Sequence, residues 1–240
     1  MSGELNVHYW FEYFTRWGGR PPTDFNGSTW AAKKMVDALK GDSINKYAYI
    51  PTVGGRTRKL TDRNRHKAPE WFGEWAAARI REAYDITSHP PILVPVPNHH
   101  VVSGFDEIYP GFELAQCIAD HLVPADVQVL DALRFKSNVG KTRTGSASRS
   151  RRAIRRNLFL LDGAWEWING FAIWESPPDC ILVDDIMASG AHLQACESLL
   201  AEAGFDVVMA VVAGRVVHEP SENAFEGGTE RMRLLRPRTR

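Results

Sequence analysis

The sequence predicts an α/β fold: a parallel sheet flanked by helices and preceded by a helical N-terminal region. From about residue 90, short apolar runs alternate with amphipathic stretches, and continuous apolar strands are typical of parallel sheets covered on both faces. Before that point, aromatic side chains recur at helical spacing. We therefore expect a helical region that forms a hood or interface over 1–85, the sheet domain over 86–218 and a basic, flexible tail over 219–240.

Three helices are expected in the N-terminal region. The first is predicted by aromatic residues at positions i, i+3, i+4 and i+7, which are Trp10, Tyr13, Phe14 and Trp17. A second begins at a cap provided by Ser28 or Thr29 and ends near Gly41, and a third, APEWFGEWAAARIREAY, has Pro69 near its start. YAYIPTV predicts a short strand between them. We interpret the Trp-rich stripes as core or subunit interface rather than as a nucleobase cage, because aromatic stripes usually mark burial.

The sheet domain is expected to alternate strands and helices. Its segments are, in order, the strand PILVPVP, the helix GFELAQCIADHL, the strand VQVLDAL, a basic segment, the strand NLFLL, the strand CILVDD, a helix from His192 to about Ala203 and the strand DVVMAVVAG. Ligands of open parallel sheets bind at the carboxyl ends of the strands. Asp184 and Asp185 are expected at such an end.

Composition excludes several classes of protein. A chain of 240 residues suits one sizeable domain, or one domain with an appendage. No apolar run is long enough to span a membrane, and the N-terminus lacks the pattern of a signal peptide. Three scattered cysteines are too few for a disulfide framework or a zinc cluster. We therefore expect a cytoplasmic protein with no membrane partner.

The net charge is zero, but the cations are clustered. Nine Lys or Arg and no acid lie between Arg134 and Arg156, five Arg and no acid lie between Arg231 and Arg240, and a third basic patch covers 55–67. Such clusters suit a polyanion, either a nucleic acid or a small phosphorylated compound. The segment 134–156 is also rich in Gly, Ser and Thr, which predicts a mobile, polar loop. For the C-terminal cluster a solvated tail is the simpler interpretation.

The most informative stretch is ILVDDIMASGAHLQACESLLAEAG, which runs from Ile181 to Gly204. Two adjacent carboxylates at the end of an apolar strand are costly to desolvate, and they are suited to accept hydrogen bonds from the two hydroxyls of a ribose. The small residues after them allow an anion to approach closely, and they lead into a helix N-terminus, which favours phosphate. The stretch therefore predicts a cradle for ribose 5-phosphate, in which Ser189 adds a hydroxyl donor.

ILVDDIMASGAHL resembles the phosphoribosyl pyrophosphate (PRPP) motif of type I phosphoribosyltransferases, and the order of the other elements is similar to that of the ComF-like (competence protein F-like) family. The shared elements are VPVP at 94–97, the Gly-Phe element of YPGFELAQCIA, and SRRAIRRNLFL, which contains Asn157. The resemblance covers about residues 86–218. It implies a parallel-sheet type I phosphoribosyltransferase domain that transfers ribosyl 5-phosphate from PRPP to a nitrogen nucleophile, such as a nucleobase, and releases pyrophosphate.

The resemblance also implies roles for individual residues. Asp184 and Asp185 would hold the ribose, and Mg²⁺ would arrive with PRPP and lie near them. The turn that would hold the 5′-phosphate consists of Ala188, Ser189, Gly190, Ala191 and His192. The loop that would face the pyrophosphate consists of Asn98, His99 and His100. The cations of a flexible lid that would close over the site and exclude water are Lys141, Arg143 and Arg149.

Several departures from the family pattern bear on these expectations. His192 replaces a hydroxyl residue that would touch the phosphate, although a charged imidazole is able to replace it. Residues 1–90 contain no cysteine for the zinc module that relatives often carry, and NHHVVSGFDE stands where arginines usually follow VPVP. Ala188 stands where relatives that use 6-oxopurines often have an aspartate, which disfavours a hypoxanthine- or guanine-type acceptor.

Other functions stay open at this point. A non-catalytic PRPP or nucleotide sensor would explain the missing arginines and His192, and a competence-like, nucleic-acid-associated protein would explain the basic patches. VGKTR does not complete a phosphate-binding P-loop, because Phe135 occupies the place of its first glycine. His99 and His100 lack a third metal ligand at a recognisable spacing, and two surface histidines are an equal alternative to a pyrophosphate-binding loop. The acceptor is not identified, and a homo-oligomer is compatible with the Trp-rich stripes.

Overall fold

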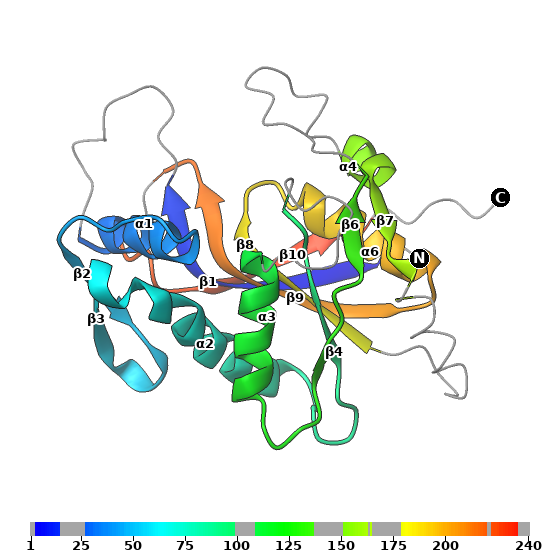
Figure 1. Ribbon diagram of the computed structural model, residues 1–240, viewed down its shortest axis with the longest axis horizontal. Helices are drawn as coiled ribbons and strands as arrows, with labels where there is room; N and C mark the ends of the chain where they lie inside the picture. The colour runs from blue at the N-terminus through cyan, green and yellow to red at the C-terminus, as the bar shows by residue number, and fades with distance from the viewer. Residues whose placement is uncertain are drawn as a thin grey trace.

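The computed structural model describes residues 3–14, 27–98, 109–136, 151–162, 164, 179–219 and 222–234. Its centre is a six-stranded sheet in the order β10-β1-β9-β8-β4-β5 (Figure 1). These strands are β10 (Gly228–Arg233), β1 (Glu4–Phe14), β9 (Asp206–Val217), β8 (Asp179–Met187), β4 (Ile92–Pro95) and β5 (Gln128–Val129). Every neighbouring pair is parallel except β1 with β10. The predicted α/β class, a mostly parallel sheet flanked by helices, is confirmed.

Both faces of the sheet are buried. One face is covered by α1 (Gly27–Leu39), α2 (Ala68–Ala83) and α3 (Pro110–His121), and the other by α4 (Arg151–Asn157), α6 (Ala191–Glu202) and the two-stranded ladder of β6 (Leu133–Phe135) with β7 (Leu158–Leu160). Along β8, Ile181 and Val183 join the first core while Cys180 and Leu182 join the second. The continuous apolar run in the sequence follows from this burial on two sides.

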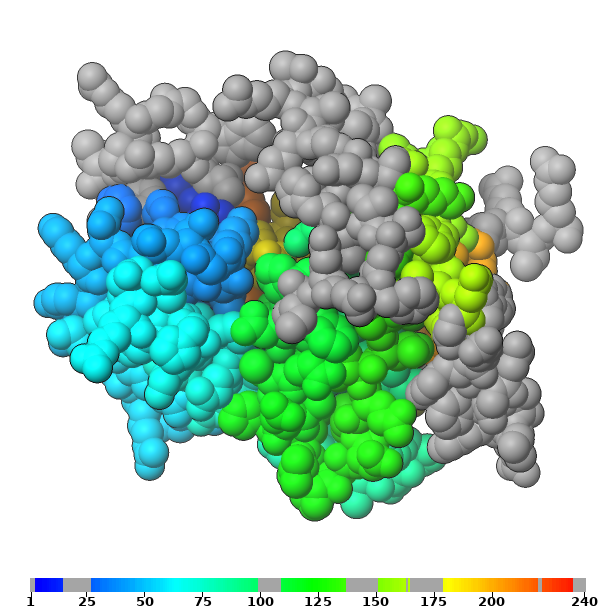
Figure 2. Space-filling view, viewed as in Figure 1, coloured from blue at the N-terminus to red at the C-terminus, as the bar shows by residue number. Residues whose placement is uncertain are grey.

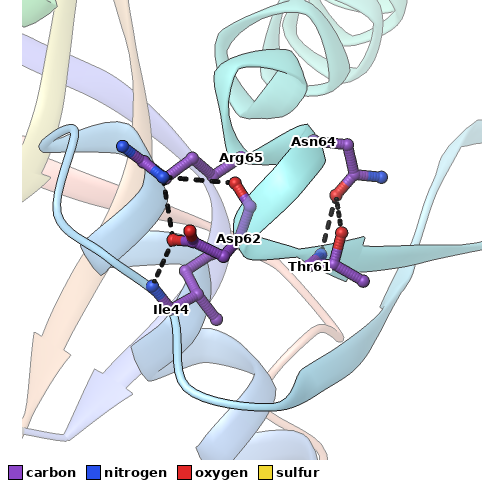
Figure 3. Close-up of polar contacts among 5 residues, drawn as sticks. All are labelled: Ile44, Thr61, Asp62, Asn64 and Arg65. Carbon is purple, nitrogen blue, oxygen red and sulfur yellow. Dashed lines mark hydrogen bonds and ion pairs between the residues drawn. The ribbon is translucent and has the colours of Figure 1, made fainter.

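A second small sheet lies on the outside of the first layer. It consists of β2 (Tyr47–Pro51) and β3 (Thr57–Thr61), which are joined by the 3₁₀ turn η1 (Val53–Gly55) and followed by η2 (Asp62–Lys67). Figure 3 shows how η2 is fixed: the backbone N–H of Thr61 donates to Asn64 Oδ1 at 2.7 Å. Asp62 Oδ1 accepts from the backbone N–H of Ile44 at 3.0 Å and from Arg65 at 2.8 Å. These bonds attach the segment before β2 to the turn that leads into α2.

The prediction of a helical N-terminal region is partly wrong. Residues 4–14 form β1 rather than a helix, and β1 lies inside the main sheet. The helices over 27–39 and 68–83 and the strand over 47–51 are confirmed. The core interpretation of the tryptophans is confirmed where the structure describes them in β1 and α2, because Trp10, Trp71 and Trp75 are buried.

Three further expectations need correction. The tail over 219–240 is not flexible throughout, because residues 228–233 form β10, in which Met232 is buried. NLFLL contributes β7, which pairs antiparallel with β6 outside the main sheet. The segment 134–156 is not one mobile loop, because its start belongs to β6 and its end to α4, while 137–150 lies outside the described residues. No helix in the described ranges is long and apolar enough to cross a bilayer.

Candidate functional site

The central motif folds as a strand, a turn and a helix. β8 continues through both aspartates to Met187, so the carboxylates lie within the strand rather than after it. The neighbouring strand β4 ends earlier, because its last paired residue, Pro95, lies opposite Val183. Asp184 is still paired with β9 on the other side. Asp184 and Asp185 therefore extend beyond β4 at the edge where the parallel strands have their carboxyl ends.

Each aspartate accepts a hydrogen bond from the backbone N–H that follows it. Asp184 Oδ1 accepts from the nitrogen of Asp185 at 2.9 Å, and Asp185 Oδ1 accepts from the nitrogen of Ile186 at 2.7 Å. Both aspartates are half-buried. Burial, followed by the charge of Asp185, raises the pKa of Asp184 well above its usual range. Within the described ranges no Lys or Arg forms an ion pair with either carboxylate, so the pair has capacity for further donors.

The turn after β8 is open to solvent and closes against β10. Ala188 and Ser189 are exposed, and Gly190 adopts φ +69° as the N-cap of α6. A Cβ added to Gly190 would lie 2.1 Å from the terminal methyl of Met232. Glycine is therefore required twice, by the left-handed backbone and by the methionine packed against it. The turn presents the first backbone N–H groups of a twelve-residue helix beside the two aspartates.

His192 lies in the first turn of α6 and is exposed. Its ring meets the buried ring of Phe135 edge to face, with 6.1 Å between the centroids. Desolvation lowers the pKa of His192 from 6.5, and the charge of Asp185 acts in the opposite direction. In the free protein this shift moves the pH range in which the imidazole carries a charge below 6.5.

The remaining predicted residues are only partly described. Asn98 is half-buried and follows β4, the neighbour of β8, so it lies toward the same edge of the sheet. His99 and His100 lie outside the described residues, and so do the three predicted lid cations, which are Lys141, Arg143 and Arg149. The structure thus brings the two aspartates and the turn 188–192 together.

A buried polar network beside this edge was missed by the sequence analysis. The Tyr109 hydroxyl donates to Asp131 Oδ1 at 2.7 Å, and one guanidinium nitrogen of Arg134 donates to the same oxygen at 2.5 Å. The other terminal nitrogen of Arg134 contacts Oδ2 of Asp131, and the guanidinium lies 5.6 Å from the centre of the Tyr109 ring. The sequence signal for this network is Asp131, three residues before Arg134 in an apolar stretch. Counting cations alone does not detect such a pair.

The network fixes the start of α3 next to the end of β4. Tyr109 is the N-cap of α3, and burial and Asp131 raise its pKa. A Cβ added to Gly111 would lie 2.8 Å from the carbonyl oxygen of Val96, so the helix approaches the strand as closely as a glycine allows. The network therefore anchors the residue that follows segment 99–108, in which the predicted pyrophosphate loop continues.

The surface is hollowed at this edge. Figure 2 shows yellow atoms of the segment around β8 at the floor of a hollow that α1 and α3 border. A separate cavity of about 800 Å³ lies between the C-terminal ends of α2 and α3, with Tyr84 and Asp85 in its lining. That cavity is close to the beginning of β8, because the Tyr84 hydroxyl donates to Asp179. It therefore lies at the opposite edge from Asp184 and is not part of the candidate site.

Metal ligands are sparse in the described part of the chain. No group of three or more His, Cys, Asp or Glu residues that could hold a metal ion occurs there. Asp184 and Asp185 offer carboxylate oxygens, which suit Mg²⁺ when substrate phosphates and water complete its coordination. Among the described residues, these two carboxylates therefore fit a Mg²⁺ ion that is bound together with a phosphorylated substrate.

Comparisons with known proteins leave the family open. No protein-family model matches the chain, and no curated protein matches it. Among solved structures, UMP synthase from Leishmania donovani is 14% identical, with 79% of this chain and 32% of that chain covered and a TM-score of 0.37. The protein TT1426 from Thermus thermophilus is 15% identical, with 64% and 85% covered and a TM-score of 0.34. The chain spans about a third of the UMP synthase chain. Similarity this low carries no argument, and the resemblance to the ComF-like family stays a prediction.

Proposed function

We propose that the chain binds PRPP and transfers its ribosyl 5-phosphate group to a nitrogen nucleophile with release of pyrophosphate. The observation that supports this most is the continuous unit of β8, turn and α6. Two half-buried aspartates lie near the end of β8, separated by two residues from an exposed turn of small residues, and that turn leads into a helix through a left-handed glycine. The chemistry of the unit matches a ligand with a vicinal diol on one side and a phosphate on the other.

The two aspartates act on the ribose. Each carboxylate keeps lone pairs after it accepts its backbone N–H, and these lone pairs accept hydrogen bonds from the 2′- and 3′-hydroxyls. Mg²⁺ bound with the pyrophosphate supplies charge neutralisation at the leaving group, and Asp184 and Asp185 are the residues that would hold it. Hydroxyl donors or a cation near Asp184 favour its ionised form, so ligand binding lowers the raised pKa.

The turn acts on the 5′-phosphate. Backbone N–H groups at the start of α6 are free to donate to phosphate oxygens, and the hydroxyl of Ser189 adds a donor. Fixing both ends of the ribosyl group orients its anomeric carbon relative to the acceptor, which is a large part of the rate enhancement available to a transfer reaction. Ala188 offers no proton acceptor at the first turn position, so an acceptor that needs an aspartate there is disfavoured.

The segment 137–150 is proposed as the lid, with Lys141, Arg143 and Arg149 as its cations. The negative charge of PRPP would compensate these three cations. Limited proteolysis tests this proposal. PRPP with Mg²⁺ should slow cleavage between 137 and 150, whereas a free nucleobase should not. Equal cleavage with and without PRPP would contradict a closing lid.

The proposed function is tested by titration calorimetry with PRPP and Mg²⁺. The double variant Asp184→Asn with Asp185→Asn should bind PRPP about 100-fold more weakly or worse, because hydrogen bonds to charged groups contribute about 1.5–3 kcal/mol each. Asp206→Asn is the matched control, because Asp206 is an exposed aspartate at the start of β9, on the opposite edge of the sheet. Unchanged PRPP affinity in a folded double variant would refute the ribose assignment.

Turnover is tested separately by pyrophosphate release from PRPP in the presence of a mixture of nucleobases. Release that depends on a base and is lost in the double variant supports a transferase. PRPP binding without release under any base would identify a sensor on the same fold and refute the catalytic part of the proposal.

A further inference from the structure

The outer face of the ribbon formed by β2 and β3 exposes two tyrosines. Tyr47 and Tyr49 are 51% and 57% exposed, whereas Ala48 and Ile50 between and after them are buried. The strand alternates as a half-buried strand should, but its outward positions carry large aromatic rings instead of small polar residues. Figure 2 shows the cyan atoms of this region uncovered on the surface in that view. Packing in the core therefore does not explain why aromatic residues occupy these two positions.

The two rings form an edge-to-face tyrosine pair, and a lysine lies over one of them. The Tyr47 and Tyr49 rings are 5.5 Å apart at 73°, and Lys59 Nζ lies 4.4 Å from the centre of the Tyr47 ring. Lys59 is paired directly with Tyr49 across the ribbon, so it reaches Tyr47 diagonally on the same face. The face thus combines stacking surfaces with a cation held in place.

The charge around this tyrosine pair is positive, and few carboxylates compensate it. Residues 43–61 contain four Lys or Arg and no Asp or Glu. Arg58 is occupied by Glu74 and lies over Trp71 on the inner side, whereas no carboxylate in the described ranges pairs with Lys46, Arg56 or Lys59. These cations repel one another, and a bound polyanion would lower that electrostatic repulsion.

Lys34 and Lys46 add positive charge at the beginning of β2. Lys34 Nζ donates to the carbonyl of Tyr47 at 2.8 Å. Burial, followed by the charge of Lys46, lowers the pKa of Lys34. Lys46 adopts φ +63°, a left-handed backbone that a non-glycine residue seldom occupies.

We infer that this face of the ribbon, consisting of Tyr47, Tyr49, Lys59, Lys46 and Lys34, binds single-stranded nucleic acid. Unpaired bases stack on the two tyrosines, and the lysines contact the phosphates. A duplex fits less well, because its bases are already stacked on one another and offer no face to a tyrosine. The inference does not depend on the proposed transfer reaction, because none of these residues belongs to the β8–α6 unit.

Fluorescence anisotropy with labelled 15-mers of dT and of U tests the inference, with one arm for DNA and one for RNA. Replacing both Tyr47 and Tyr49 with Ala should weaken binding by about 100-fold, because each ring stacks one base and stacking on an aromatic residue is worth about tenfold per base. Replacing both with Phe should leave binding within about threefold, because the rings are kept. Both positions are exposed, so circular dichroism should show that each variant folds.

The lysines are tested by salt dependence. Replacing Lys46 and Lys59 with Gln should reduce the slope of log affinity against log salt by about 1.4, since each phosphate contact on a single strand contributes about 0.7. Arg152→Gln is the matched charge control, because Arg152 is an exposed cation on α4. Its affinity should stay within about twofold of the native chain.

Several results would overturn the inference. These are equal binding of the native chain and the double Ala variant, equal binding of a 15-base-pair duplex and the single strands, and no binding of any oligonucleotide at low salt. A larger loss in Arg152→Gln than in the ribbon variants would move the nucleic-acid site to the other face. A change in sedimentation mass on replacing the tyrosines, with unchanged oligonucleotide affinity, would identify the ribbon as an interface between copies of the chain.

Discussion

The ion pair between Asp131 and Arg134 should respond asymmetrically to the loss of either partner. The Arg134 side chain is 1% exposed and the Asp131 side chain is 25% exposed. Asp131→Asn removes the carboxylate and leaves a buried guanidinium, whereas Arg134→Met removes the buried charge and leaves a carboxylate that water is able to reach. We therefore expect Asp131→Asn to be the more destabilising change.

The magnitudes follow from burial. Breaking a buried ion pair by removing one partner costs about 3–5 kcal/mol when the charge left behind is buried. For Arg134→Met the loss is that of the hydrogen bonds from the guanidinium to Asp131 and to the carbonyl of Leu133, about 1–3 kcal/mol. In a chain of this size about 1 kcal/mol corresponds to roughly 2–4 °C in Tm. Asp131→Asn should therefore lower Tm by roughly 6–20 °C, and the double variant should recover part of that loss, because it no longer buries an uncompensated charge.

Urea unfolding and calorimetry on the two single variants and the double variant measure the coupling between the residues. Glu82→Gln is the matched control: Glu82 pairs with Arg79 at the same i,i+3 spacing, but the side chains are 62% and 45% exposed. An exposed pair contributes less than about 1 kcal/mol. The reasoning is refuted if Asp131→Asn costs no more than Glu82→Gln, or if adding Arg134→Met to Asp131→Asn lowers stability further.

Three other changes test the candidate site. Gly190→Ala should lower the free energy of unfolding in urea by about 1–3 kcal/mol, because a left-handed alanine costs about 1–2 kcal/mol and its Cβ displaces Met232. Adding Met232→Ala should relieve only the steric part of this loss, because the backbone strain stays. Asp184→Asn should raise Tm at neutral pH. Since the pKa of Asp184 is raised in the folded protein, the stability of the native protein falls as pH rises from about 3.9 through that folded pKa. The Tm curves of the native protein and of Asp184→Asn should therefore merge in acid. A difference in Tm that is the same at every pH would contradict the assignment. His192 has a lowered pKa, so the ratio of native to His192→Thr affinity for PRPP should increase only as pH falls below 6.5; a flat ratio in calorimetry would mean that the backbone alone binds the phosphate.

The elements that sequence predicts well are those whose pattern allows one interpretation. β8 and β9 contain continuous apolar runs, which are typical of strands buried on both faces, and α2 and α3 have Pro at the first or second helical position. The turn after β8 was also predictable, because its small residues and Gly190 tolerate the left-handed, sharply turned backbone that leads from the strand into α6. Asp184 and Asp185 were expected at the end of the strand, and β8 continues for two residues beyond them.

β1 shows why the rest was not predictable. Trp10, Tyr13 and Phe14 match a helical spacing, but Leu5 and Val7 alternate with exposed neighbours as in a strand. Local pattern supports both readings, and the strand prevails because β9 and β10 supply backbone partners on its two sides. Those partners lie at the other end of the chain, which no local window contains.

Charge counting failed for a related reason. Arg134 and Arg149 are equivalent in composition, yet Arg134 is buried against Asp131 while Arg149 lies outside the described residues. Whether a cation is available to a ligand depends on the acid that reaches it in three dimensions. In the tail, Met232 alternates with Arg231 and Arg233, a strand pattern that the strong basic bias obscured.

The position of β1 determines the order in which the sheet is completed during synthesis. β1 leaves the ribosome before the other strands of the sheet, yet its neighbours β9 and β10 are the last two to emerge, and roughly 200 residues separate Asn6 from its partner Met209. Closing so long a loop has an entropic cost that must be met before pairing returns any stability. Leu5, Val7 and Trp10 therefore stay unpaired through most of translation, which makes this strand a segment that chaperones are expected to shield in the cell.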